Sequence, residues 1–304
     1  RAENLFLHKQ APVQLEKCRL CQSPAQRLFD MDVLGKHRVN YHRCMGCGAL
    51  QTDKPHWLDE AYTDKAERFD TGKASRTLVN FLAFPKLLET LQVRKTDRAV
   101  DFGGGTGLFA RLMRDMGYDF HCCDKYGSAE FMAGYAWNDI AHKCSLVTIF
   151  EVAEHFAEPA AEWERIFAAD PDFVIGSTGL YNEQSAAQGA AWPYLIPDSG
   201  QHVFFYSFEA IRYLARKHGR HAYNLGMYFI LSRDVLAEPV LAGLKRWREQ
   251  LMPACQSTFD HWAQGPYVHA TRDNLEVAAW SQLEQKSARI AIDGVFFRFS
   301  SGIA

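Results

Sequence analysis

Val100-Asp-Phe-Gly-Gly-Gly-Thr-Gly-Leu108 is a short apolar run that contains one acid and ends in clustered glycines. The run predicts a strand that turns directly into a helix around a bound, nucleotide-like ligand. Glycine is needed in such a turn because the backbone bends tightly and lets ligand atoms approach where a Cβ would collide. The helix is expected over Ala110–Met116, where apolar residues recur at helical spacing before Gly117.

Two carboxylates indicate which ligand this unit takes. Asp101 stands at the entrance to the glycine turn, where it is badly placed for a pyrophosphate and well placed for an ammonium group. Asp124 follows a second expected strand, 118–123, at the distance where βαβ folds hold ribose hydroxyls. Alone, the glycine turn and Asp124 would be an ordinary loop and an ordinary turn acid. Together they favour S-adenosylmethionine (SAM), which carries an ammonium, a sulfonium and a ribose but no phosphate.

The length and the charge of the chain limit the classes of protein to which it can belong. The 304 residues can bury a large core and would form one large domain or two smaller ones. The formal net charge of −2 argues against a large nucleic-acid footprint, which needs a basic patch. No apolar run reaches membrane-spanning length, and the first residues lack the charged-then-apolar pattern of a signal peptide. We therefore expect a cytoplasmic protein without membrane insertion.

Four of the eight cysteines form two pairs, Cys18-x-x-Cys21 and Cys44-x-x-Cys47. This spacing matches a four-cysteine zinc ribbon, because each pair turns two sulfurs toward one tetrahedral ion. A redox motif would need only one pair. Four sulfurs leave no open coordination position, so the expected zinc is structural. The remaining cysteines are interpreted as small buried apolar residues, namely Cys122, Cys123, Cys144 and Cys255.

The rest of the pattern predicts an α/β fold. Alternating residues predict hairpin strands over 27–33 and 36–42, between the cysteine pairs, and a helix over 75–92 that is interrupted at Pro85. Beyond Asp124, strands and helices alternate, which is typical of a doubly wound (Rossmann-like), mostly parallel sheet. The expected elements are strands near 131–135, at 145–150 and at 173–176, helices at 159–169 and 208–218, and an antiparallel terminal hairpin over 221–232.

Two histidines are expected at the edge where such sheets bind ligands, beyond the carboxyl ends of the strands. His155 follows the fourth strand, and His202 ends a long connection after the fifth. Histidine suits a proton-transfer step because its unperturbed pKa is near neutrality, so we predict both as catalytic residues. The alternative is that each histidine caps a turn or bonds a backbone carbonyl. The connection itself is aromatic and proline-rich, and Trp192 is expected to form part of a wall over the substrate.

The residues 101–107, Asp124 and the run Glu151-x-x-Glu-His155 resemble the class I SAM-dependent methyltransferases. The resemblance covers roughly residues 97–234. It implies that SAM is the cofactor. The residues it assigns to that cofactor are Asp101 at the methionine amino group, Gly103 and Gly105 lining it, Asp124 on the ribose hydroxyls, and Glu151.

With the cysteine pairs added, the chain is similar to the bacterial C-methyltransferases that act on nucleotide-linked deoxysugars. That family carries a histidine after the fourth strand, matched by His155, and a Tyr-His-Glu-His-Phe-x-Tyr-Phe-Ser segment, which residues 199–207 resemble with His202 at the final histidine. Gln201 stands where the family has glutamate, so O-methylation of a sugar-like acceptor stays open beside C-methylation. A glutamine can hold a hydroxyl but cannot act as a base, and we assign Gln201 and Tyr206 to the substrate with Trp192.

The predicted parts are a zinc-binding module over residues 1–60, a connecting helical segment over 61–95, a SAM-binding methyltransferase domain over 96–234, and a mainly helical extension over 235–304. The predicted function is methyl transfer from SAM to a sugar, nucleotide-sugar or glycoconjugate acceptor. One alternative is an RNA methyltransferase whose zinc module binds nucleic acid. The acidic net charge and the absence of an Asn/Asp-Pro-Pro-aromatic run stand against it. The other alternative is a non-catalytic interaction module that keeps the fold.

Overall fold

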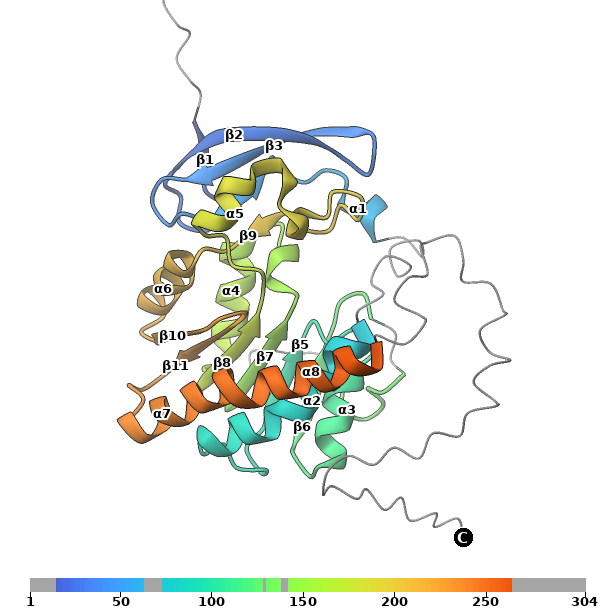
Figure 1. The fold of residues 1–304 in the computed structure, drawn as a ribbon, viewed down its shortest axis with the longest axis vertical. Coiled ribbons are helices and arrows are strands. Elements are labelled where there is room, and N and C mark those ends of the chain that lie inside the picture. The colour runs from blue at the N-terminus through green and yellow to red at the C-terminus, as the bar shows by residue number, and fades with distance from the viewer. Residues whose placement is uncertain (1–14, 63–72, 128–129, 138–141, 264–304) are drawn as a thin grey trace, which may run out of the picture. The chain divides into compact units, whose positions relative to one another are not determined.

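A computed structural model of the chain describes residues 15–62, 73–127, 130–137 and 142–263 (Figure 1). The chain divides into a unit over Arg1–Gln256 and a second unit over Ser257–Ala304, and the fold described below is that of the first. The predicted extension over 235–304 is described as far as residue 263, and the rest of it lies outside the described residues. None of the described helices is long and apolar enough to cross a membrane.

A six-stranded sheet forms the centre of the first unit. Its strand order is β10-β11-β8-β7-β5-β6, and the strands are β5 (Ala99–Phe102), β6 (Phe120–Cys123), β7 (Leu146–Phe150), β8 (Phe173–Ser177), β10 (His221–Leu225) and β11 (Tyr228–Ser232). The four strands β5 to β8 are parallel, β11 runs antiparallel to β8, and β10 runs antiparallel to β11. The predicted Rossmann-like sheet with an antiparallel terminal hairpin is therefore confirmed.

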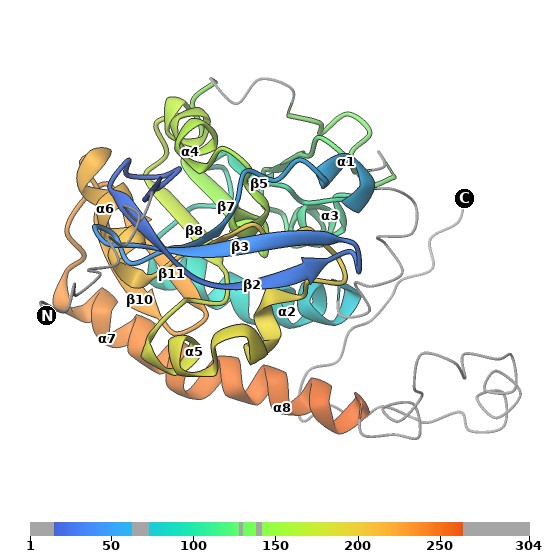
Figure 2. The ribbon, with the colours of Figure 1, turned by 90° about the horizontal axis from the view of Figure 1, so that it is seen from above.

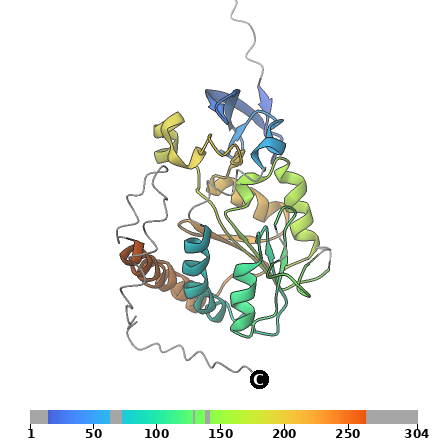
Figure 3. The same cartoon turned by 90° about the vertical axis from the view of Figure 1, so that its right-hand side faces the viewer.

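Helices cover both faces of this sheet because its strands are apolar on both sides. In β8, Val174 packs into one core and Ile175 into the other, as the two-residue period of a strand requires. The first face is covered by α4 (Pro159–Ala168) and α6 (Phe208–Lys217), and the second by α2 (Lys73–Thr90), α3 (Leu108–Asp115) and α7 (Glu238–Arg246). Figure 3 shows α7 (orange-brown) beside α2 (teal) on the second face. The chain is thus a three-layer α/β fold around the sheet.

Two sequence expectations in this region are wrong. The helix expected to break at Pro85 runs on without interruption from Lys73 to Thr90. Phe84 and Leu87 on either side of the proline are fully buried, and their packing outweighs the lost backbone hydrogen bond.

The strand expected near 131–135 is a series of turns, with a single bridge between Cys122 and Ala136. Arg114 provides the reason, because its guanidinium donates to the carbonyl oxygens of Phe120 (3.0 Å) and Phe131 (2.6 Å). The Arg114 side chain thus provides the donor that the Phe131 carbonyl oxygen would otherwise find in a neighbouring strand.

The N-terminal residues form a second, antiparallel sheet of five strands in the order β1-β2-β3-β4-β9. Its strands are β1 (Glu16–Lys17), β2 (Pro24–Val33), β3 (His37–Cys44), β4 (Leu50–Thr52) and β9 (Phe204–Phe205). The hairpin predicted between the cysteine pairs is confirmed as β2 and β3. Figure 2 looks down on this long hairpin, which lies over the edge of the six-stranded sheet where β7 and β8 end.

The fifth strand of the N-terminal sheet comes from far along the chain. β9 pairs with β4 through Leu50 opposite Phe205 and Gln51 opposite Phe204. The intervening connection after β8 holds α5 (Glu183–Gln188) and the short 3₁₀ turns η3 (Gly189–Ala191) and η4 (Pro193–Leu195). The short helix α1 (Leu58–Ala61) follows β4 and lies just before residue 62, where the first described range ends. The β4–β9 pairing joins the predicted zinc-binding module to the predicted methyltransferase domain.

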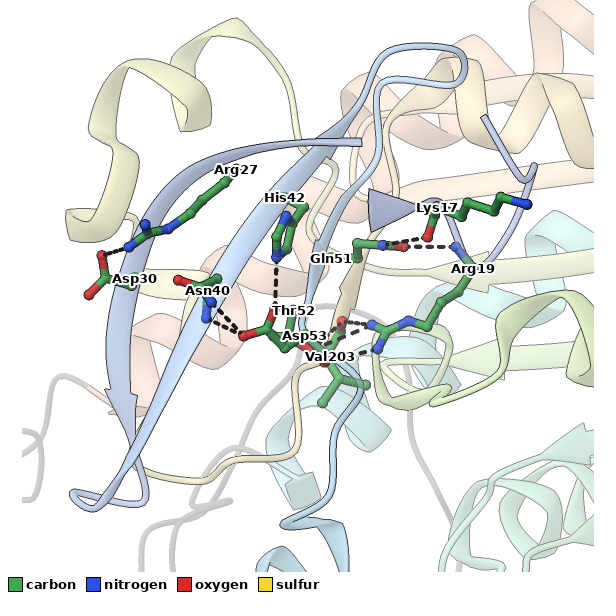
Figure 4. Close-up of polar contacts among 10 residues, drawn as sticks. All are labelled: Lys17, Arg19, Arg27, Asp30, Asn40, His42, Gln51, Thr52, Asp53 and Val203. Atoms are coloured by element: carbon green, nitrogen blue, oxygen red, sulfur yellow. Dashed lines mark hydrogen bonds and ion pairs between the residues drawn. The ribbon is translucent and has the colours of Figure 1, made fainter. Parts of the chain in front are cut away.

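Polar side chains reinforce this junction (Figure 4). The half-buried Arg19 guanidinium donates to the carbonyl oxygens of Val203 at 2.5 Å and Asp53 at 3.1 Å, and the Arg19 backbone N–H donates to Gln51 Oε1 at 2.8 Å. Burial lowers the pKa of Arg19 to about 10. A guanidinium that loses its water needs such acceptors, so Arg19 ties the cysteine-bearing loop to the chain just before β9.

The C-terminal helices have a packing role that the sequence alone does not indicate. α7 continues through a π-helical turn, η5 (Trp247–Leu251), into α8 (Met252–Ala263). Trp247 is buried, and its indole N–H donates to the carbonyl oxygen of Ala83 in α2 at 2.8 Å. A Cβ on Gly243 would lie 2.5 Å from Thr90 Cγ2, so α7 approaches α2 closely. The first part of the extension therefore completes the helical layer around α2.

We expect Arg19→Ala to lower the free energy of unfolding by about 2–3 kcal/mol, because it removes the charge-assisted hydrogen bonds that the guanidinium donates to Val203 and Asp53. Arg27→Ala is the control, since the Arg27 guanidinium pairs with the nearby Asp30 and its side chain is 56% exposed. That control should change stability by less than about 1 kcal/mol. Urea unfolding followed by circular dichroism measures both. Equal losses for the two variants would contradict the role given to Arg19.

Candidate functional site

The predicted site residues gather at the carboxyl edge of the parallel strands. Gly103 follows β5, Asp124 follows β6 and Glu151 follows β7 (Figure 1). Trp192 and His202 lie on the connection after β8. Parallel strands end at a common edge, so segments far apart in the sequence meet there.

The glycine turn after β5 needs glycine for two separate reasons. Gly103 and Gly105 adopt φ angles of 73° and 60°, which disfavour residues with a Cβ. A Cβ on Gly103 would also lie 2.5 Å from Val152 Cγ1, and a Cβ on Gly104 would collide with the Asp101 carboxylate. The turn is therefore closely packed from beneath.

The Asp124 carboxylate binds the two loops beside it. Its Oδ2 accepts from the N–H of Gly105 at 2.7 Å, and its Oδ1 accepts from the N–H groups of Tyr126 at 2.7 Å and Gly127 at 2.5 Å. Of the about four lone pairs that a carboxylate offers, these three N–H groups leave one for a further donor. Asp124 thus fixes the glycine turn to the loop after β6 and can still accept a hydroxyl.

Asp101 lies beneath the glycine turn and is only 3% exposed. Its Oδ1 accepts from the Thr148 hydroxyl at 2.7 Å. Burial raises the pKa of Asp101 to about 7, and the Thr148 hydrogen bond offsets only part of that rise. A carboxyl group of this kind becomes ionised when a positive charge is placed nearby. This environment fits a cationic ligand above the turn.

A buried acidic network lies after β7. Glu151 has a φ of 53°, and its Oε1 accepts from the Ser177 hydroxyl at 2.7 Å. The Tyr194 hydroxyl is 2.9 Å from Glu151 Oε2 and 2.6 Å from Glu154 Oε1. One phenolic proton cannot serve two carboxylates, so the network holds a second proton. Burial raises the pKa of Glu154 to about 8, and the charge of Glu151 adds to the rise, which makes Glu154 the group that holds this proton.

His155 and His202 lie side by side, with ring centroids 5.1 Å apart. Glu154 and His155 belong to the 3₁₀ turn η2 (Ala153–His155). His155 Nδ1 is 3.0 Å from the Tyr62 hydroxyl, and His202 Nδ1 donates to the carbonyl oxygen of Tyr194 at 2.7 Å. Burial lowers the pKa of His155 well below its ordinary range, and His202 and Arg76 add to that effect. The His155 ring is therefore neutral at neutral pH.

A chain of contacts joins the two histidines to the glycine turn. The Tyr62 ring stacks on the Tyr126 ring at 4.4 Å between centroids and 8° between planes. Tyr62 bonds His155 through its hydroxyl, and the Tyr126 N–H donates to Asp124. The residues predicted for the cofactor and those predicted for catalysis are thus in one continuous cluster.

The three residues predicted to bind the substrate lie in different surroundings. Gln201 is next to His202 in the sequence, and its amide N–H donates to the carbonyl oxygen of Ala61 at 3.0 Å. Trp192 is half-buried, and its ring packs 5.5 Å from that of Tyr194. Tyr206 is 0% exposed and accepts from the Trp163 indole at 2.9 Å. The structure places Tyr206 in the core, because its ring and its hydroxyl both find partners there.

The four paired cysteines form one cluster, in which each sulfur lies within 4.8 Å of the other three. Cys18 and Cys47 sulfurs are 3.8 Å apart, and Cys21 and Cys44 sulfurs are 3.4 Å apart. Sulfurs bound tetrahedrally to one zinc ion are about 3.8 Å apart. The Cys44 sulfur also accepts from the N–H groups of Gly46 and Cys47, both at 3.3 Å. The donor set and its spacing fit a tetrahedral thiolate site.

Crowding of these sulfurs prevents all four from ionising without a cation. The hydrogen bond with Cys44 raises the pKa of Cys18 to about 12, while the pKa of Cys44 is lowered by the same contact. The other cysteines lie outside the cluster, with Cys122 and Cys144 buried and Cys123 and Cys255 half-buried.

We call the group formed by Tyr62, Glu154, His155, Tyr194 and His202 the histidine cluster. Sequence reasoning missed three of its members. Glu154 stands inside the quoted run Glu151-x-x-Glu-His155 and could have been chosen from it. Tyr62 and Tyr194 had no such signal, because nothing in their local sequence indicates that they meet His155 and His202. Their roles depend on contacts between distant segments. Tyr62 and His155, for example, are 93 residues apart in the sequence.

Comparison with known families gives a match over the same region. A family model described as a methyltransferase domain matches residues 59–220, which is just over half of the chain. No curated protein is similar enough to match.

Among solved structures, human N-acetylserotonin methyltransferase in complex with SAM is 14% identical with a TM-score of 0.43, over 59% of this chain and 59% of that one. The plantazolicin methyltransferase BamL is 13% identical with a TM-score of 0.42, over 68% and 85%. Magnesium protoporphyrin IX methyltransferase from Synechocystis PCC 6803 is 15% identical with a TM-score of 0.39, over 57% and 90%. Likenesses at this level identify no acceptor.

We expect Asp101→Asn to change how stability depends on pH. In the wild type, the raised pKa of Asp101 means that the unfolded chain loses this proton first, near pH 4, while the folded chain keeps it to about pH 7. Asp101 therefore contributes stability below about pH 4 that is lost as the pH rises to 7. Relative to the wild type, the asparagine variant should gain about 1 kcal/mol or more between pH 4 and pH 7.5.

Urea unfolding at several pH values measures this difference. Thr148→Val is the matched variant, because it removes the hydrogen bond that lowers the Asp101 pKa and so should extend the loss of stability to higher pH. A difference between wild type and Asp101→Asn that stays constant with pH would show that Asp101 is ionised throughout.

Proposed function

This chain belongs to the methyltransferase domain family, and we propose that it transfers a methyl group from SAM to a carbon or oxygen atom of a sugar, nucleotide-sugar or glycoconjugate acceptor. The observation that carries the proposal is the contact chain from Asp124 through Tyr126 and Tyr62 to His155. It puts titratable groups next to the loops suited to a cationic adenosyl ligand. SAM supplies an electrophilic methyl group, so the chain must align an acceptor and manage its proton.

The cofactor end is supported by the glycine turn and two acids. In the proposal, Asp124 accepts from one ribose hydroxyl with its remaining lone pair, and Gly103 and Gly105 line the methionine part. Asp101 lies beneath them and becomes ionised when the cation approaches. Glu151 completes this set, because its strained backbone and its hydrogen bonds to Ser177 and Tyr194 hold its carboxylate at the edge.

The acceptor end is supported by the two histidines. The His202 Nδ1–H bond to the Tyr194 carbonyl oxygen places the ring lone pair on Nε2, which can take a proton from an acceptor. His155 is neutral beside it and, because burial disfavours its protonated form, is suited to accept a hydrogen bond from the acceptor. Gln201, adjacent to His202, offers an amide oxygen to an acceptor hydroxyl, and Trp192, whose ring packs 5.5 Å from that of Tyr194, forms an apolar wall of the proposed acceptor site.

For the cysteine cluster we propose one structural zinc ion held by Cys18, Cys21, Cys44 and Cys47. The Ser207 hydroxyl donates to the Cys47 carbonyl oxygen at 2.5 Å, and β9 lies between Ser207 and His202. A metal that orders the cysteine loops would therefore also order the segment that carries His202. The zinc has no open position for a substrate, so its effect on catalysis is through positioning.

Two variants separate the proposed roles. We expect His202→Ala to lower kcat about 10²–10⁴-fold with little change in SAM affinity, because it removes the proton acceptor. Asp124→Ala should do the reverse and weaken SAM binding about 10–100-fold, since hydrogen bonds to a charged group are lost. Asp124→Asn keeps one acceptor oxygen and should lose less. His221→Ala, an exposed histidine, is the control for His202→Ala.

Calorimetry with SAM and with NAD, and S-adenosylhomocysteine release with a panel of sugar nucleotides, measure these effects. NAD binding more tightly than SAM would end the proposal. Unchanged SAM affinity in Asp124→Ala would remove Asp124 from the ribose.

Removal of zinc tests the structural role. We expect Cys18→Ser to lose the thiolate-bound zinc and to lower the thermal midpoint, because binding energy at such a site is folding energy. Cys255→Ser, outside the cluster, should keep both the zinc and the midpoint. Metal content by mass spectrometry and melting by circular dichroism check the outcome. Loss of zinc with an unchanged midpoint would contradict a structural role.

A further inference from the structure

Three side chains of the histidine cluster are arranged as a second set of metal donors. One carboxylate oxygen of Glu154, one ring nitrogen of His155 and one of His202 all lie within 4.8 Å of one another. Two of the three residues are adjacent in η2, and the third is held next to them by the segment before β9. No sulfur belongs to this set, so it differs in chemistry from the cysteine cluster.

Both histidines have the hydrogen bond that a metal-binding imidazole normally makes. A ligating histidine donates its other ring N–H to a carbonyl, carboxylate or similar acceptor, which orients the ring and fixes the tautomer. His202 donates from Nδ1 to the carbonyl oxygen of Tyr194 at 2.7 Å. His155 Nδ1 lies 3.0 Å from the Tyr62 hydroxyl, which can accept in the same way. In both rings Nε2 is then the nitrogen that carries the lone pair.

Glu154 supplies the independent evidence for a ligand. Its side chain is 0% exposed, and Oε1 is bonded to the Tyr194 hydroxyl at 2.6 Å. Oε2 is buried and has no hydrogen-bond partner among the residues that the structure describes. A buried carboxyl oxygen without a hydrogen-bond partner is costly, and a cation between it and two imidazole nitrogens would remove that cost as Glu154 releases its proton.

We propose that Glu154, His155 and His202 bind one divalent transition-metal ion, separate from the ion at the cysteine cluster. Two imidazoles and one carboxylate are a donor set that suits zinc, iron(II), cobalt(II) or manganese(II) and leaves coordination positions open. The role of the ion rests on the methyl transfer proposed above. In that reaction the open coordination positions take oxygen atoms of the acceptor. When the ion is bound, the His202 Nε2 lone pair is on the metal, so the acceptor hydroxyl loses its proton to water rather than to His202, and the ion would lower the pKa of that hydroxyl.

The geometry needs only a small adjustment to hold an ion. Bonds of about 2.1 Å keep any two donors of one ion within about 4.2 Å of each other, so donors that lie within 4.8 Å need to approach by at most about 0.6 Å. Rotation of the Glu154 carboxylate and the imidazole rings can supply this. The local charge is favourable, because Glu151 and Glu154 face the site, while Arg76 contributes one opposing positive charge near His155.

Manganese(II) binding by the full chain, with zinc already at the cysteine cluster, tests the proposal. Thiolate sites select against manganese, so electron paramagnetic resonance of the bound ion reports the second site alone. We expect the wild type to bind one manganese ion per chain. Glu154→Gln and His202→Ala should weaken that binding at least about tenfold.

Glu158→Gln is the matched control, because Glu158 is an exposed acid four residues after Glu154. It should bind manganese like the wild type. Zinc content and the circular dichroism spectrum of each variant establish that it is folded. Cobalt(II) gives a second readout, since the cysteine cluster shows thiolate charge-transfer absorption and the second site shows none.

The outcomes distinguish this inference from the proposed function. Equal manganese affinity in the wild type and Glu154→Gln, or no manganese bound by the zinc-loaded wild type, overturns the metal site. Methyl transfer by enzyme with metal only at the cysteine cluster would overturn the ion's role at the acceptor and leave the proposed function intact. One manganese ion per chain, lost in Glu154→Gln, supports the site even where no sugar acceptor is methylated.

Discussion

The pairing of β9 with β4 is the constraint on which the site depends. Leu50 opposite Phe205 and Gln51 opposite Phe204 attach the chain after His202 to the cysteine-bearing sheet. On the other side of β9, the N–H of Val203 donates to the carbonyl oxygen of Glu154 at 2.9 Å. These backbone bonds hold His202 beside η2, and a single register brings the two histidines together.

Electrostatics gives this edge its chemistry. Asp101 and Glu154 are both buried, and both have raised pKa values because little solvent reaches them. His155 is held neutral by the same burial. A site that keeps its acids protonated and its imidazole uncharged without a ligand is ready for a cation, because a positive charge lets the carboxyl groups ionise. The cofactor expected from the family carries such a charge.

Much of the α/β core was predictable, because its signals are local. The strands β5 to β8, the helices α3, α4 and α6 and the terminal hairpin each follow from apolar periodicity and turn residues. The glycine turn, Asp124 and the cysteine pairs were also visible as motifs. The uninterrupted helix through Pro85 was not, because buried packing at Phe84 and Leu87 overrides the local effect of a proline. Tyr206 was assigned to substrate for its position in a motif, whereas packing against Trp163 decides its place.

The sequence by itself determined the family, the Rossmann-like sheet and the identity of most polar residues at its edge, because spacing along one segment encodes strand, turn and helix. Only the tertiary structure decided that Tyr62, Glu154, Tyr194 and the two histidines form one cluster. Their separation along the chain carries no information about their distance in space. That distance is set by β9, a strand that the chain after β8 contributes to the N-terminal sheet, and by the requirement that buried carbonyl groups and carboxylates find donors.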